Sequence, residues 1–132
     1  MRRVATALAL ALCLLGCSGS RGEQVPLITV EPVPPGCCLL LYAVVDVVAD
    51  PSTGTPTIKG NGLPLKWPMG YTAWRVGSEV QVLDGAGSVV LTTGSRYRIE
   101  PTYELDTTQD QSTWVVGDVK PCADCELGGG TL

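Results

Sequence analysis

Alternation of apolar and polar residues between positions 79 and 92 predicts the clearest element of this chain, a β-hairpin. Residues 79–82 alternate between Glu or Gln and Val, the period of two that puts successive side chains on opposite faces of a strand, and Leu83 follows. Asp84-Gly85 follows, and its glycine can adopt the positive φ that a tight connection requires. The apolar run at 88–92 supplies the second strand of the hairpin.

Other short apolar stretches, bounded by Gly and Pro, predict further strands. The most apolar one after the N-terminal region is 37–49, whose β-branched residues favour a strand buried on both faces. Shorter strands are expected at 27–30, 57–59, 63–68, 71–76, 97–99 and 113–119, with a bend at Gly117. Proline at both ends of 63–68 suggests a sheet edge. Six or seven short strands without a convincing helix predict an all-β fold, a small closed or partly open barrel.

A different apolar pattern begins the chain. Arg2 and Arg3 precede an apolar run from Val4 to Leu15, which is the layout of a secretory signal. The run is too short for a membrane anchor, because about twenty apolar residues are needed to span a bilayer. The sequence therefore predicts an exported protein.

The end of this run, Leu14-Leu15-Gly16-Cys17, resembles the lipobox of bacterial lipoproteins. The resemblance implies cleavage after Gly16 and a diacylglyceryl group on Cys17, which becomes the new N-terminus. It also implies that the protein is lipid-anchored to a bacterial membrane and faces the extracytoplasmic side.

The domain organisation predicted from these patterns has four parts. Residues 1–16 are the signal peptide, and 17–35 are the lipidated N-terminus and a tether rich in Pro, Gly and Ser. Residues 36–127 form the β-barrel domain, and 128–132 are a Gly-rich tail. The tether is expected to space the domain from the membrane.

Several short motifs resemble a family of small, uncharacterised exported bacterial lipoproteins. They are Gly36-Cys37 followed by leucines, residues 66–70 (Lys-Trp-Pro-Met-Gly), the hairpin at 80–91, Gly94, and Cys125 before Gly128–Gly130. The domains of that family are similar to short barrels of the oligonucleotide/oligosaccharide-binding (OB) type, so the resemblance implies an OB-like barrel. The family has no known activity, and the insertion at 100–112 and the doubled Cys37-Cys38 depart from its pattern.

Composition narrows the possible chemistry. The chain has no histidine, which removes Ser-His-Asp and Cys-His catalysis and histidine metal sites. Its formal charge is −4, and no run of Lys or Arg provides a footprint for nucleic acid. No cofactor and no metal are expected. Phe is absent too, so three Trp and four Tyr supply all the aromatic surface.

Six cysteines are the richest chemical feature. Cys13 leaves with the signal peptide and Cys17 is lipidated, so Cys37, Cys38, Cys122 and Cys125 remain as disulfide candidates in three possible pairings. A bridge between the two halves would close a loop of about 85 residues and contribute roughly 4–5 kcal/mol. The alternatives are a redox pair at Cys122 and Cys125, or structural zinc, for which the adjacent Cys37-Cys38 is a poor half-site.

Aromatic residues between 67 and 75 suggest a binding face. Exposed aromatics stack on sugars, bases or prolines, and Trp67, Tyr71, Trp74 and Arg75 are the candidates for ligand contact. We expect Trp67 and Trp74 at its rim. The alternative is that the aromatic side chains fill the core in place of Phe.

These observations favour a non-catalytic binding or structural module of the cell envelope, with a cell-wall glycan, a peptide or an envelope protein as its ligand. The alternative is an enzyme, either a hydrolase that uses carboxylates between Glu100 and Asp118 or a thiol-redox protein. The acidic residues of that region do not match a calcium-loop motif, and a solvated loop is the simpler interpretation.

Overall fold

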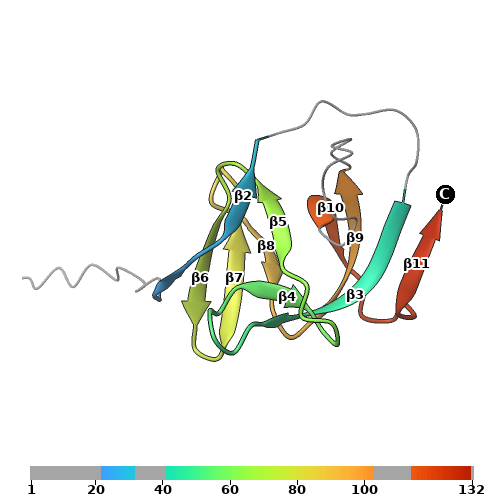
Figure 1. Ribbon diagram of the computed structural model, residues 1–132, viewed down its shortest axis with the longest axis horizontal. Helices are drawn as coiled ribbons and strands as arrows, with labels where there is room; N and C mark the ends of the chain where they lie inside the picture. The colour runs from blue at the N-terminus through green and yellow to red at the C-terminus, as the bar shows by residue number, and fades with distance from the viewer. Residues whose placement is uncertain (1–21, 32–40, 103–113, 132) are drawn as a thin grey trace, which may run out of the picture.

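The computed structural model describes residues 22–31, 41–102 and 114–131 (Figure 1). Within these ranges, all regular secondary-structure elements are β-strands. Cys17, Cys37 and Cys38 lie outside these residues. The strands are β1 (Gln24–Val25), β2 (Ile28–Val30), β3 (Leu41–Ala49), β4 (Pro56–Ile58), β5 (Leu65–Pro68), β6 (Thr72–Val76), β7 (Glu79–Leu83), β8 (Val89–Thr92), β9 (Arg96–Thr102), β10 (Trp114–Pro121) and β11 (Gly128–Thr131). The predicted all-β class is confirmed.

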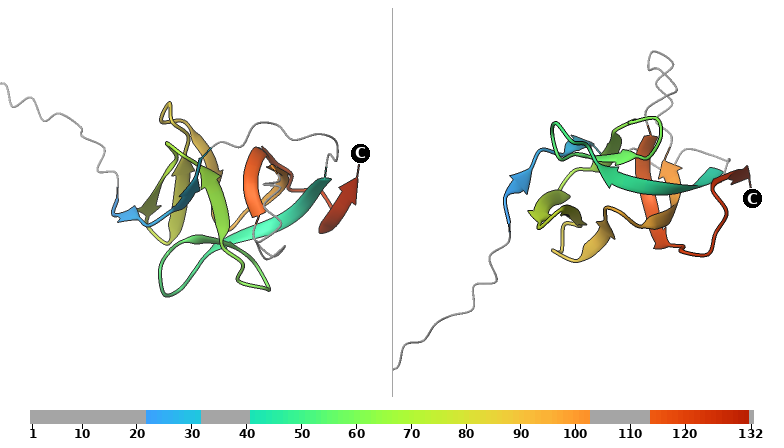
Figure 2. Two further views of the ribbon diagram at one scale, coloured as in Figure 1. Left: turned by 45° about the horizontal axis from the view of Figure 1, so that its top comes forward. Right: turned by 90° about the horizontal axis from the view of Figure 1, so that it is seen from below.

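The strands form two sheets (Figures 1 and 2). The smaller is antiparallel, in the order β1-β6-β7-β8. The larger is mixed and curls into a half-barrel in the order β11-β3-β9-β10-β5-β2, with β4 paired to β3 as well. Its parallel pairs are β10 with β5 and β2 with β5.

The curled sheet nearly returns to its starting strand. β3 pairs with β9 through Ala43–Asp46 and with β4 through Val47–Ala49. A single bridge between Thr57 and Pro64 then links β4 to the chain just before β5. Within the described residues, this bridge is the only pairing between β4 and β5, so the larger sheet is a half-barrel.

The core lies where the two sheets face each other, and its side chains follow the alternation of the strands. Trp67 is the largest fully buried side chain. Around it pack residues from both sheets: Val25, Val47, Ile58, Leu65, Ala73, Val80, Val82, Leu91, Tyr97, Ile99 and Val116. The buried hydroxyl of Thr93 accepts the N–H of Val80 at 2.8 Å, so this polar group is satisfied inside the core.

The predicted hairpin is confirmed, with one change in its turn. β7 and β8 pair, and the chain reverses through residues 84–88. Asp84 Oδ1 accepts the N–H groups of Ala86 and Ser88, both at 2.9 Å. The positive φ belongs to Gly87, at 85°, not to Gly85. The predicted irregularity at Gly117 is also present, as a register shift of β10 between Val116 and Asp118.

Three segments differ from the sequence expectation. β5 is not an edge strand, since it lies between β10 and β2. Its prolines occur only near the ends of the strand, so they leave the N–H groups of Leu65 to Trp67 for pairing. The glycines at 128–130 form β11 beside β3 instead of a tail. Residues 24–30, assigned to the tether, contribute β1 to one sheet and β2 to the edge of the other.

The packing of this N-terminal segment can be tested with Val25, which is 4% exposed and belongs to the core. Val25→Ala removes buried methyl groups and should lower the free energy of unfolding by about 2 kcal/mol, measured by urea denaturation. Ile28→Ala is the matched control, because Ile28 is 43% exposed in the same segment. Equal effects of the two substitutions would mean that β1 does not pack as described.

Candidate binding site

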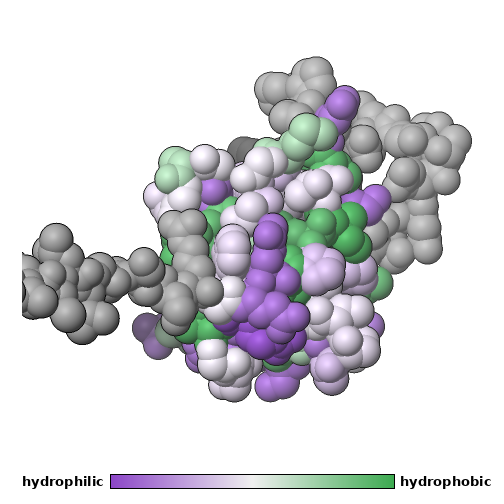
Figure 3. All heavy atoms as spheres, turned by 90° about the vertical axis from the view of Figure 1, so that its left-hand side faces the viewer, coloured by the Kyte–Doolittle hydropathy of each residue, from purple (hydrophilic) through white to green (hydrophobic). Residues whose placement is uncertain are grey.

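A shallow depression of about 400 Å³ opens where the N-terminal segment crosses β6. Its lining comes from residues 24–27, Thr29 and residues 71–73. Val25 and Ala73 are paired neighbours of β1 and β6 and are buried, so they form its floor. Figure 3 views the molecule from this side and shows hydrophilic side chains gathered at the centre of the face.

Of the predicted binding residues, Tyr71 alone lines the depression. It is half-buried at the end of the turn after β5, and its ring centroid lies 5.8 Å from that of Trp67. Trp67 has no exposed surface, so its expected position at the rim is wrong. The physical reason is volume: the two sheets close around the indole, which fills the centre of a core that has no Phe.

The other two predicted residues lie next to the depression without lining it. Trp74 is half-buried opposite Gln24 in the β1–β6 ladder, and its Nε1–H donates to Thr72 Oγ1 at 3.2 Å. Arg75 is half-buried, with its side chain against Gly54. Both side chains therefore hold the surroundings of the depression in place.

The lining determines what the depression can bind. Its polar groups are neutral: the amide of Gln24, the hydroxyls of Thr29 and Thr72, and the phenol of Tyr71. Its apolar lining residues are Val25, Pro26, Leu27 and Ala73. No Asp, Glu, Lys or Arg is part of this lining, so the site suits an uncharged ligand held by stacking and neutral hydrogen bonds.

Sequence reasoning missed the half of this site that comes from residues 24–29. The β-branched run Ile28-Thr29-Val30 did predict an edge strand, and β2 lies there. The surrounding prolines, however, led us to assign the segment to the tether. The two-residue strand β1 is too short for any periodicity to be read.

A second cluster of functional groups lies on the larger sheet, on the face of β9 turned away from the core. Arg98 and Glu100 alternate along β9 with the buried Tyr97 and Ile99. The guanidinium of Arg98 stacks 3.9 Å from the ring centroid of Tyr42. Its Nε lies 3.6 Å from Glu100 Oε1, too far for a hydrogen bond, and is buried without a hydrogen-bond partner.

The carboxylates on this face that the structure describes are paired with cations. Lys120 Nζ lies 2.9 Å from Asp118 Oδ2 and 3.7 Å from Glu100 Oε1. The hydrogen bond from Lys120 lowers the pKa of Asp118, whereas the general acid of a glycosidase needs a raised pKa. This pairing does not favour Asp118 as a general acid, and the acidic residues between Glu100 and Asp118 lie outside the described residues.

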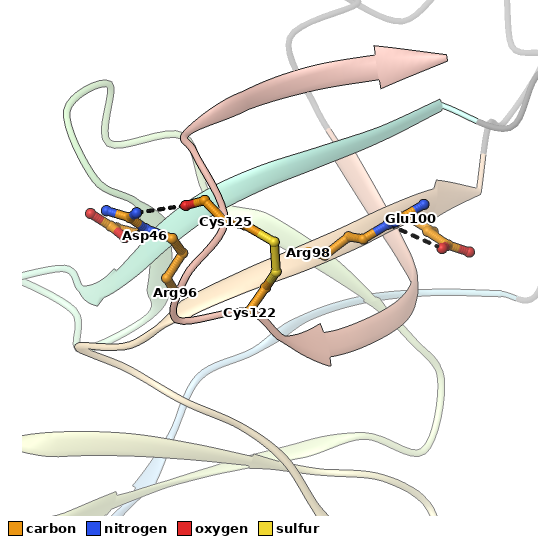
Figure 4. The surroundings of a disulfide bond; sticks show 6 residues. All are labelled: Asp46, Arg96, Arg98, Glu100, Cys122 and Cys125. Atoms are coloured by element: carbon orange, nitrogen blue, oxygen red, sulfur yellow. Dashed lines mark hydrogen bonds and ion pairs between the residues drawn. A yellow bond between two sulfur atoms is a disulfide. The ribbon is translucent and has the colours of Figure 1, made fainter. Parts of the chain in front are cut away.

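Asp46 and Arg96 form a closer pair across β3 and β9. Arg96 Nε donates to Asp46 Oδ1 at 2.8 Å, and Lys59 Nζ lies 3.9 Å from the other oxygen. The hydrogen bond from Arg96 is the main reason why the pKa of Asp46 lies below its usual value. Arg96 Nη1 also donates to the carbonyl of Cys125 at 2.7 Å, which ties β9 to the chain after β10 (Figure 4).

Cys122 and Cys125 are joined by a disulfide, with Cα atoms 5.4 Å apart (Figure 4). The expected long-range bridge from Cys37 or Cys38 to this pair is therefore not formed by these two sulfurs. The turn brings the sulfurs together locally, since Cys125 N–H donates to Cys122 O and Cys122 N–H donates to Arg96 O. Sulfurs bonded to each other are not thiolate ligands for zinc.

Within the described ranges, no three or more Cys, Asp or Glu side chains gather into a set that could ligate a metal ion. The same ranges contain no helix with the length and apolarity to cross a bilayer. Comparison with protein-family models, with curated proteins and with solved structures finds no match to this chain. The geometry and the motifs are therefore the basis for assigning a function.

The Asp46–Arg96 pair makes a prediction about pH. Because the pKa of Asp46 is lower in the folded than in the unfolded chain, the pair stabilises the fold above about pH 4, and this stabilisation is lost as the pH falls through the folded value. The stability difference between wild type and Asp46→Asn should be largest at neutral pH and shrink below pH about 4 in urea titrations. Asp124→Asn, which removes an exposed carboxylate, is the control. A difference that stays constant with pH would contradict this role of Asp46.

The disulfide makes a prediction about stability. Its loop holds only four residues, so replacing both Cys122 and Cys125 with Ser should lower the free energy of unfolding by about 2 kcal/mol, not the 4–5 kcal/mol of an 85-residue loop. Urea denaturation gives the global value. Amide hydrogen exchange should show the loss concentrated in β11, which follows the loop. Unfolding of the whole domain on loss of the bridge would contradict a local role.

Proposed function

We propose that this chain is an exported bacterial lipoprotein, anchored by a diacylglyceryl group on Cys17, whose β-domain is a non-catalytic binding module of the cell envelope. The lipobox-like motif Leu14–Cys17 and the apolar run in front of it support the anchor. The short motifs shared with small exported lipoproteins support the same class. The ligand we propose is an uncharged glycan of the envelope.

The observation that carries this function is the depression beside Tyr71. A half-buried aromatic ring next to neutral amide and hydroxyl groups is the combination that binds sugars, because the ring covers the apolar face of a sugar while the polar groups bond its hydroxyls. The depression is open and shallow, which suits a segment of a longer chain. Its lining offers no acid–base pair, so binding without catalysis is the simplest function.

We further propose that the larger sheet is a barrel of the OB type. In such barrels the first strand pairs with the second and the fourth, and the third runs parallel to the fifth. Taken as these five strands, β3, β4, β5, β9 and β10 have that order and those directions. β6, β7 and β8 form an inserted sheet between the third and fourth strands.

Thiol–disulfide exchange at Cys122 and Cys125 is the second candidate. Both cysteines are half-buried, and a four-residue loop adds little to global stability, so the bridge can open without unfolding the barrel. The double-serine variant separates the two functions. It should keep glycan binding if the depression is the functional site, and it should lose any exchange activity with a small dithiol.

The Tyr71 site can be tested with neutral oligosaccharides released from bacterial envelopes. Tyr71→Ala removes the stacking ring and should weaken binding by roughly tenfold or more, the equivalent of about 1–3 kcal/mol, measured by isothermal titration calorimetry. Tyr71→Phe keeps the ring and should keep most of the affinity. Because Trp67 lies 5.8 Å from Tyr71, binding should also change the tryptophan fluorescence.

Met69→Ala is the matched control, since Met69 is 58% exposed two residues before Tyr71 and does not line the depression. Circular dichroism of each variant establishes that it is folded. Equal binding by Tyr71→Ala and Met69→Ala would rule out the depression as the glycan site. Binding of peptides or envelope proteins, but not of oligosaccharides, in a Tyr71-dependent way would overturn the glycan as ligand.

A further inference from the structure

Residues 22–31 belong to the folded body and are not part of a tether. β1 pairs with β6 through Gln24 and Val25, and β2 pairs with β5 through residues 28–30. The segment thus contributes a strand to each sheet (Figures 1 and 2), and its Val25 side chain lies in the core. Pulling this segment away would break both pairings and open the core.

The contacts of the segment extend to its first described residue. Arg75 N–H donates to the carbonyl of Glu23 at 2.8 Å. The backbone of Gly22 packs against that of Arg75 so closely that a Cβ at position 22 would overlap the Arg75 carbonyl oxygen. Thr55 Oγ1 donates to the carbonyl of Pro26 at 3.3 Å and fixes the segment to the loop after β3. The folded body therefore extends at least to Gly22, the first described residue of this segment.

This boundary limits how far the domain can lie from the lipid. Cys17 is five positions before Gly22. Five residues span at most about 18 Å when fully extended. We propose that the domain is held directly at the membrane surface, within about 18 Å of the acylated cysteine, with the β6–β7 end towards the bilayer. This inference rests on the proposed lipidation of Cys17.

The end of the domain near Gly22 is formed by the β6–β7 turn and the loop after β3. Among the described residues, this end carries the carboxylates of Glu23, Asp50 and Glu79 and the guanidinium of Arg75. Asp50 stays ionised, because the Ser52 hydroxyl and the N–H groups of Ser52 and Thr53 bond its carboxylate and lower its pKa. An acidic end does not adsorb to anionic lipid, so the short linker alone keeps the domain close. The distance between the domain and the membrane should therefore depend on the length of the linker and not on the lipid composition or the salt concentration.

The same geometry specifies where the ligand of the Tyr71 depression must be. Gln24 lines the depression and is seven positions after Cys17, at most about 25 Å along an extended chain. The depression therefore samples the layer directly above the headgroups. Its ligand belongs to that layer and not to the outer parts of the envelope.

The test uses the full-length lipidated protein in vesicles of neutral phospholipid that carry a dansyl-labelled lipid. Energy transfer from the protein's tryptophans to the label reports proximity, and Trp74 is close to the linker through its pairing with Gln24. Wild type should transfer efficiently. Inserting twenty Gly and Ser residues after Ser20 raises the average reach to roughly 28 Å and should lower the transfer by about half or more.

A variant in which Ser20 and Arg21 exchange places keeps the linker length and should match wild type. Replacing part of the neutral lipid with anionic lipid, or raising the salt concentration, should leave the transfer unchanged. Gly22→Val, in which the Cβ displaces Gly22 from Arg75, should give intermediate transfer in a folded protein, as judged by circular dichroism.

Mass spectrometry of the same samples separates the two ways in which the idea can fail. If wild type and the insertion variant are both acylated and show equal energy transfer, the close placement is wrong and the lipoprotein assignment remains intact. Protein without a lipid on Cys17 would overturn the proposed anchor and, with it, this inference. Acylated protein in which only the insertion variant loses transfer is the expected result.

Discussion

The structure depends on filling a small core without phenylalanine. Trp67 is the largest fully buried side chain, and both sheets contribute residues to the cluster around it. A core assembled around one bulky indole needs cover from every side. Val25, from the N-terminal segment, is part of this cover. Trp67 therefore cannot leave the core to contact a ligand, and the binding role that we propose belongs to Tyr71 beside it.

Local patterns predicted the parts of the fold that depend on local chemistry. The hairpin of β7 and β8 follows from alternation and turn residues, β3 from its β-branched run, and the bulge from Gly117. The sequence did not reveal β11, since glycines carry no side-chain pattern and the strand exists only because the edge of β3 is available. Nor did it reveal the role of residues 24–30, whose pairing partners are about forty to fifty positions away.

The candidate site likewise has one part that the sequence could predict and one part that it could not. Tyr71 was predicted as one of the aromatic residues between 67 and 75 that could stack on a ligand. Its partners Gln24 and Thr29 come from a distant segment and required the coordinates. The disulfide was predictable as a C-x-x-C motif, but the choice between local and long-range pairing was open, since spacing alone permits both. The ion pairs of β9 are contacts between strands and have no signature along the chain.

Strand β11 has a consequence for how copies of this protein coexist. It covers the edge of β3, the most apolar strand, using mostly glycine backbone. An open edge of that composition is a template for pairing with another chain. A short glycine strand satisfies the N–H and C=O groups of β3 and offers its neighbours almost no apolar side chains on which to build. β11 therefore protects the protein against aggregation. Removing this strand should cause self-association before it causes loss of the fold.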